Sequence, residues 1–141
     1  MPTIEQVRPV IEDCYRQNWL KWFAGRPEFQ PARIEVRELD GSSCYSHTDD
    51  HLAIFISAWN LEDRDVLDTA GWPSWRSELI HEMLHEWQLK TLTPATKEAT
   101  HLMTLRPANF PGPNHDATFY QALIDKAPLL DMTPEELLPR I

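Results

Sequence analysis

Two histidines and a glutamate near the middle of the chain have a spacing that suits a metal ion. The segment is His81-Glu82-Met83-Leu84-His85, which matches the pattern H-E-x-x-H. On a helix, His81 and His85 lie one turn apart, with Cβ atoms about 5–6 Å from each other, so both imidazoles can bind one ion. Glu82 is offset by about 100° around the helix, where it can reach a water on that ion. The pattern predicts His81 and His85 as zinc ligands and Glu82 as a general base.

A catalytic zinc site needs a third protein ligand and an open position for water. Three residues further along the chain are candidates: Glu98, His101 and His115. Glu98 and His101 share one segment. His115 stands at a loop-to-helix junction, from which a side chain can be aimed back at the central helix. Spacing alone leaves all three open. We expect one Zn²⁺ per chain, although the motif does not distinguish zinc from other divalent ions.

The metal motif requires a helix, and the residues around it predict one over 74–93. Ser74 can cap its start, and Pro94 makes Thr93 the expected end. Apolar residues recur there at helical spacing and give the helix a face to bury: Leu79, Ile80, Met83, Leu84 and Trp87.

Before this central helix, the sequence predicts a helix and a small sheet. The N-terminal helix begins either near Thr3, with a kink at Pro9, or near Arg8. Strands are expected over 32–39, 44–47 and 52–58, the last with apolar residues on both faces.

Two further segments have residue patterns that indicate their structure or role less directly. The polar link 46–51 holds two histidines and two aspartates, and it is either a turn, a second metal site or a substrate loop. A short helix is also possible over 62–69.

After the central helix, three more helices are expected. Thr93 should cap the first, with Pro94 at its first position. The segment 114–116 opens the second, and Thr133 starts a short tail helix. Together these elements predict one α+β domain over residues 1–141.

Composition narrows the class of protein. The chain has 141 residues, of which 42% are hydrophobic and 25% charged, with a net charge of −9. This acidic balance disfavours direct binding to nucleic acid. Cys14 and Cys44 form no zinc ribbon and are expected to be free thiols, with a single disulfide as the alternative. We find no signal peptide and no apolar run of membrane-spanning length, so we expect a cytoplasmic protein without a membrane partner. The oligomeric state is not predicted.

Two segments of the chain resemble the SprT-like family of zincin metallopeptidases. Residues 81–88 match its H-E-M-x-H-x-W-Q helix, and His115-Asp116-Ala117-Thr118-Phe119 is similar to its H-[GN]-x-x-[FW] pattern. Asp116 departs from the usual Gly or Asn, and the C-terminal zinc ribbon of some members is missing. The resemblance covers roughly residues 10–125. It implies a minimal zincin-like fold with an N-terminal helix, a sheet of about three strands, the central helix and C-terminal helices. It also favours His115 as the third ligand.

The predicted function is therefore zinc-dependent hydrolysis of peptide bonds in a protein or peptide substrate, with Glu82 as the base. An oxyanion donor is also needed, and Tyr120, His101 and His47 are candidates. Asp116, Glu86 and Asp68 are possible partners for the ligand histidines. Two alternatives remain: a non-peptidase zinc hydrolase, and a zincin-fold module that binds a protein and has lost catalysis.

Overall fold

The computed structural model describes residues 3–38, 45–48, 51–56, 75–105 and 115–135. Some sequence predictions fall outside these residues: the cap at Ser74, the thiol of Cys44, the carboxylate of Asp68 and the short helix over 62–69. The chain forms two compact units, Met1–Met83 and Leu84–Ile141, and the boundary between them falls inside the central helix.

Helix α1 (Ile4–Trp22) opens the first unit. Thr3 caps it in a reciprocal capping box: the Gln6 amide N–H donates to Thr3 Oγ1 at 3.3 Å, and the Thr3 amide N–H donates to Gln6 Oε1 at 2.9 Å. The helix therefore begins at the earlier of the two predicted starts, and Pro9 lies within it. Its buried residues are spaced by four, four and seven positions and so share one face of the helix: Val7, Ile11, Tyr15 and Trp22.

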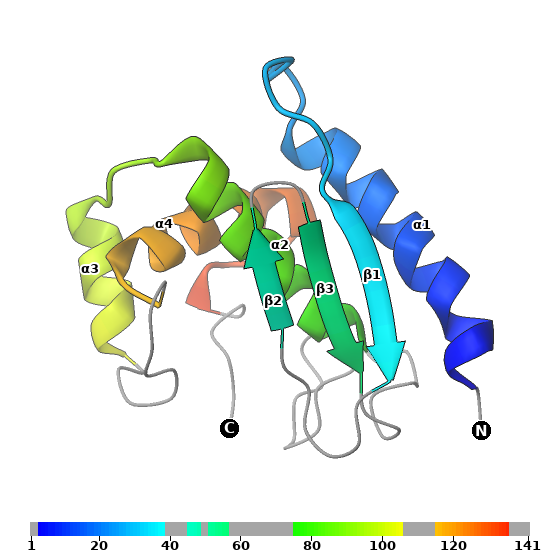
Figure 1. The fold of residues 1–141 in the computed structure, drawn as a ribbon. Coiled ribbons are helices and arrows are strands. Elements are labelled where there is room, and N and C mark those ends of the chain that lie inside the picture. The colour runs from blue at the N-terminus through cyan, green and yellow to red at the C-terminus, as the bar shows by residue number, and fades with distance from the viewer. Residues whose placement is uncertain (1–2, 39–44, 49–50, 57–74, 106–114, 136–141) are drawn as a thin grey trace. The chain divides into compact units, whose positions relative to one another are not determined.

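Strands β1 (Arg33–Glu38), β2 (Tyr45–Thr48) and β3 (His51–Ile56) also belong to the first unit. They pair in the order β1-β3-β2, with β1 parallel and β2 antiparallel to β3 (Figure 1). Strand β3 thus pairs on both sides, as its continuous apolar sequence favours. Helix α1 is tied to the start of β1, because the Ala32 amide donates to Tyr15 Oη at 2.8 Å.

Residues 46 and 47 were assigned both to a strand over 44–47 and to a polar link over 46–51, and the interpretation as a link was wrong for residues 46–48 and 51. Residues 46–48 lie in β2 and His51 begins β3, so backbone pairing between the two strands determines their structure. Residues 49–50 lie outside the described residues.

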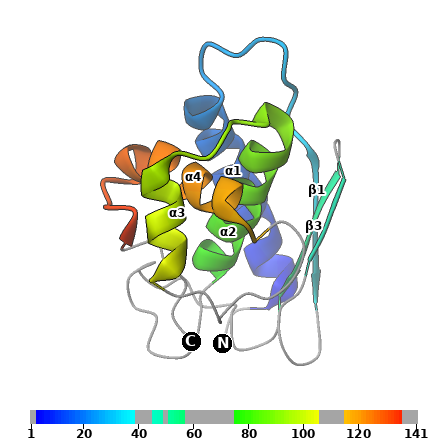
Figure 2. The same ribbon diagram turned by 90° about the vertical axis from the view of Figure 1, so that its left-hand side faces the viewer.

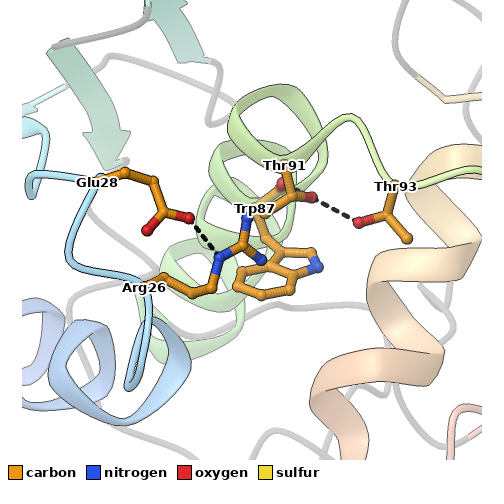
Figure 3. A network of polar contacts seen from close by, with 5 residues as sticks. All are labelled: Arg26, Glu28, Trp87, Thr91 and Thr93. Atoms are coloured by element: carbon orange, nitrogen blue, oxygen red, sulfur yellow. Dashed lines mark hydrogen bonds and ion pairs between the residues drawn. The ribbon is translucent and has the colours of Figure 1, made fainter.

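Helix α2 (Trp75–Thr91) carries the metal motif and ends two residues before the predicted end at Thr93. Leu92 has a left-handed backbone, with φ of 51°, and its amide bonds back to the Gln88 carbonyl at 3.2 Å. Thr93 then donates from Oγ1 to Thr91 Oγ1 at 2.9 Å (Figure 3). Thr91 Oγ1 in turn donates to the Trp87 carbonyl at 2.7 Å. The Thr93 hydroxyl therefore completes the end of α2.

Helix α3 (Lys97–Thr104) begins later than predicted, and the assignment of Thr93 as its cap was wrong. Thr96 is the cap, and its Oγ1 accepts from the Ala99 amide at 3.3 Å. Gln121 fixes Thr96 in this role, since Gln121 Oε1 accepts from the Thr96 amide at 2.9 Å and from its hydroxyl at 2.7 Å. The start of α3 thus depends on a residue of another helix.

Helix α4 (Ala117–Lys126) starts at Asp116, whose carboxylate accepts from the Thr118 amide at 2.9 Å. It lies beside α3 (Figure 2) and continues into the 3-10 helix η2 (Ala127–Leu130). The two helices contribute several apolar residues to the core of the second unit: Ala99, Leu102, Phe119, Ala122 and Leu123. The predicted tail helix runs beyond residue 135 and so mostly outside the described residues.

No helix in the part of the chain that the structure describes is long and apolar enough to cross a membrane.

Candidate metal centre

Three histidines form the one group of potential metal ligands found among the described residues. One ring nitrogen each from His81, His85 and His115 lies within 4.8 Å of the others. His81 and His85 occupy successive turns of α2, and His115 precedes the cap of α4. His85 is fully buried, whereas His81 and His115 are half-buried.

The contact between His85 and His115 fits the geometry of zinc. Their Nε2 atoms are 3.1 Å apart. In a tetrahedral site with Zn–N bonds of 2.0–2.1 Å, two ligand nitrogens lie about 3.3–3.4 Å apart. A small opening of the pair would therefore match one edge of that tetrahedron. Three imidazoles with a fourth position left for water are also a donor set of catalytic zinc sites.

Phe119 orients both rings of this pair. The His85 ring stacks on Phe119 with centroids 4.5 Å apart and planes at 30°. The His115 ring meets the same Phe119 edge-on, at 5.4 Å and 84°. Phe119 is only 1% exposed, so one buried ring supports two candidate ligands from different segments.

Gln88 engages the ring nitrogen of His85 that does not face His115. His85 Nδ1 is 2.9 Å from Gln88 Oε1. The orientation of the Gln88 amide follows from its other contacts: its Nε2 donates to Thr118 Oγ1 at 2.8 Å and to Asp116 Oδ1 at 3.3 Å, and the carboxylate can only accept. Oε1 must then accept from His85 Nδ1–H. This tautomer leaves the lone pair on Nε2, the nitrogen that faces the candidate metal position.

Burial and hydrogen bonds shift the pKa values of titratable groups around the site. Burial lowers the pKa of His115, against the opposing influence of the nearby Asp116 carboxylate, and so favours the neutral imidazole that binds metals. The Thr118 hydroxyl, with backbone amides and the Gln88 amide, lowers the pKa of Asp116. Burial raises the pKa of Tyr120, which keeps its phenol neutral.

The other predicted site residues have different surroundings. Glu82 lies beside His81 on α2 and is 3% exposed. Glu98 and His101, the alternative third ligands, lie on α3 with exposed side chains and outside the histidine group. Tyr120 is buried in α4 and meets Phe119 edge-on at 5.6 Å. His47 lies in β2, and its side chain is outside the described residues.

Two of the residues proposed as partners for the candidate ligand histidines lie among the described residues, and both make polar contacts. Asp116 contacts Gln88, as described above. Glu86 forms an ion pair with Lys90, with Oε2 and Nζ 2.6 Å apart. Gln88 and Phe119 match the family patterns quoted above, but their roles as supports of the site were not predicted from the sequence. A helical spacing of three residues from His85 was the available signal for Gln88. For Phe119 it was the aromatic four residues after His115.

Comparisons of the sequence and of the structure with protein-family models, curated proteins and solved structures found no match.

Proposed function

We propose that the protein is a zinc-dependent metallopeptidase of the SprT-like type, in which His81, His85 and His115 hold the metal. The observation that carries the proposal is the convergence of these three nitrogens within 4.8 Å. It joins an H-E-x-x-H helix to a third histidine that comes 30 residues after His85. Such a constellation supports metal-assisted hydrolysis rather than nucleophilic catalysis by a side chain.

The proposed roles follow from the residue types and their positions. Zinc at this site would polarise the scissile carbonyl and bring the pKa of a bound water toward about 7. Glu82 accepts a proton from the attacking water and delivers it to the leaving amine. Gln88 and Phe119 hold the two rings of the His85–His115 pair in place.

The oxyanion donor stays a choice among the three predicted residues. Tyr120 is favoured chemically, because a neutral phenol can donate a hydrogen bond to a developing negative charge.

The test is a comparison of wild type with Glu82→Gln on a mixture of fluorescence-quenched peptides of degenerate sequence. The variant should bind as much zinc as wild type, and its rate should fall by roughly 10²–10⁴-fold. Glu135→Gln, at an exposed position in the second unit, is the matched control and should leave the rate unchanged.

Three results would contradict the proposal. Full activity in Glu82→Gln would remove the assigned base. A wild-type chain that takes up no zinc would remove the metal site. A chain that binds one zinc but cleaves none of the peptides would favour a binding module with a zincin-like site.

A further inference from the structure

Gln88 is a buried amide whose polar atoms contact His85 on α2 and also the segment that follows His115. Its side chain is 6% exposed, so each polar atom needs a partner within the protein. Oε1 accepts from His85, and Nε2 donates to Thr118 and Asp116. The amide thereby joins a proposed ligand on α2 to the cap of α4 and to the second residue of that helix.

The position of Gln88 on α2 explains this reach. It comes three residues after His85, so the two side chains are neighbours on the helix surface. Asp116 directly follows His115, and Thr118 comes three residues after it. A change in the orientation of the Gln88 amide would therefore act on the ring of one ligand and on the segment that carries another.

We propose that Gln88 is a positioning residue for metal binding. It holds His85 in the tautomer with a free Nε2 lone pair, and it couples that ring to the segment bearing His115. This inference rests on the proposed three-histidine site. Outer hydrogen bonds of this kind usually change metal affinity by 10–100-fold.

The choice of an amide at this position is explained by Asp116. A carboxylate would also accept from His85 Nδ1–H, and carboxylates commonly orient metal-bound histidines. At position 88, however, it would lie about where Nε2 now donates to Asp116 Oδ1 at 3.3 Å, and two negative charges would face each other. Glutamine supplies an acceptor for His85 and a donor for Asp116 in one side chain.

The first experiment measures zinc affinity by competition with a chromogenic chelator for wild type, Gln88→Leu and Gln121→Leu. Gln121 is the matched control: it is a buried glutamine of the same unit, 5% exposed, and it bonds to Thr96 and Asp125 but to no ligand histidine. Gln88→Leu should weaken zinc binding by roughly 10–100-fold. Gln121→Leu should keep the wild-type affinity even where it lowers the melting temperature.

A second pair of variants keeps the inference testable if Gln88→Leu does not fold. Gln88→Glu should weaken zinc binding, because it places a carboxylate against Asp116. Gln88→Glu with Asp116→Asn removes that repulsion and retains a good helix cap, so its affinity should return toward wild type. The absorption bands of the Co²⁺-loaded chains report the ligand field directly. They should change in Gln88→Glu and recover in the double variant.

The outcomes separate this inference from the proposed function. Wild type that binds no zinc would remove the metal site and the inference together. Wild type with one zinc, and Gln88→Leu with an affinity within about twofold of it, would overturn the inference alone. Equal weakening in Gln88→Leu and Gln121→Leu would show a general effect of fold stability, and would also overturn it. A double variant no better than Gln88→Glu would contradict the explanation based on Asp116.

Discussion

His85 and His115 face each other through their Nε2 atoms at 3.1 Å, with ring planes at 66°. One nitrogen lies in the middle of α2 and the other just before α4. At this separation the two atoms share a hydrogen bond when one of them carries a proton, and zinc requires nearly the same separation of its ligands. The same pair of nitrogens can therefore hold a proton or a metal ion with little rearrangement.

His115→Ala tests whether this pair belongs to a metal site. Purified wild type should contain about one zinc per chain by elemental analysis. His115→Ala removes a proposed ligand, so its affinity should fall by more than the roughly 10–100-fold expected for loss of an outer hydrogen bond. His101→Ala, on the exposed side of α3, should retain the wild-type zinc content. Loss of zinc in His101→Ala but not in His115→Ala would reassign the third ligand.

Local patterns in the sequence predicted the parts of the site that depend on one helix. The spacing of His81 and His85, with Glu82 between them, needs only a helix over that segment, and α2 supplies it. His115 was one of three candidates by spacing, because the distance between helices is not encoded in any short segment. Resemblance to a family favoured it, and the structure then placed it 3.1 Å from His85.

Long-range contacts caused the errors. Thr93-Pro94 is a good start signal for a helix, but α3 begins after Thr96 because Gln121, 25 residues away in sequence, fixes that threonine. The role of Gln88 was missed for the same reason. Its spacing from His85 is visible in the sequence, whereas its contacts with Asp116 and Thr118 depend on how α4 folds against α2.

The ion pair between Arg26 and Glu28 predicts a pH effect in the first unit. Arg26 Nε donates to Glu28 Oε1 at 2.6 Å (Figure 3) and lowers the pKa of Glu28 below its ordinary value of 4.5. A lowered pKa in the folded state means that the pair stabilises the fold above the unfolded pKa and that this stabilisation is lost as pH falls. A carboxyl titration followed by NMR should show the lowered midpoint.

Arg26→Ala should move the Glu28 midpoint up toward 4.5, and high salt should narrow the difference between the two proteins. Arg16→Ala removes an arginine that pairs with Glu12 on α1, and it serves as the control. An equal shift of the Glu28 midpoint in both variants would show that the net charge of the protein, and not the contact with Arg26, sets the pKa of Glu28.

Leu92 is a position where the backbone conformation predicts the sign of the change in unfolding free energy on substitution. It combines a left-handed backbone, with φ of 51°, and a side chain that is 78% exposed. A non-glycine residue in this conformation costs about 1–2 kcal/mol, and glycine avoids most of that at an entropic cost of about 0.5–1 kcal/mol. Leu92→Gly should therefore raise the free energy of unfolding by about 0.5–1 kcal/mol in a denaturant titration. Leu20→Gly, at an exposed position within regular α1, should lower it by about 1 kcal/mol.

The buried ion pair on α2 predicts how charge substitutions change the stability of the second unit when no metal is bound. Glu86 is fully buried and Lys90 is 9% exposed, with Nζ 2.6 Å from Oε2. Lys90→Met takes a cation away from a buried carboxylate, and such changes cost about 3–5 kcal/mol. Replacing both residues by apolar ones, as in Glu86→Leu with Lys90→Met, should cost less than Lys90→Met alone, because no charge is then left buried. Urea titrations of the metal-free chains measure this difference. Additive losses in the double variant would show that the two charges act independently, and the close contact would then contribute little to the fold.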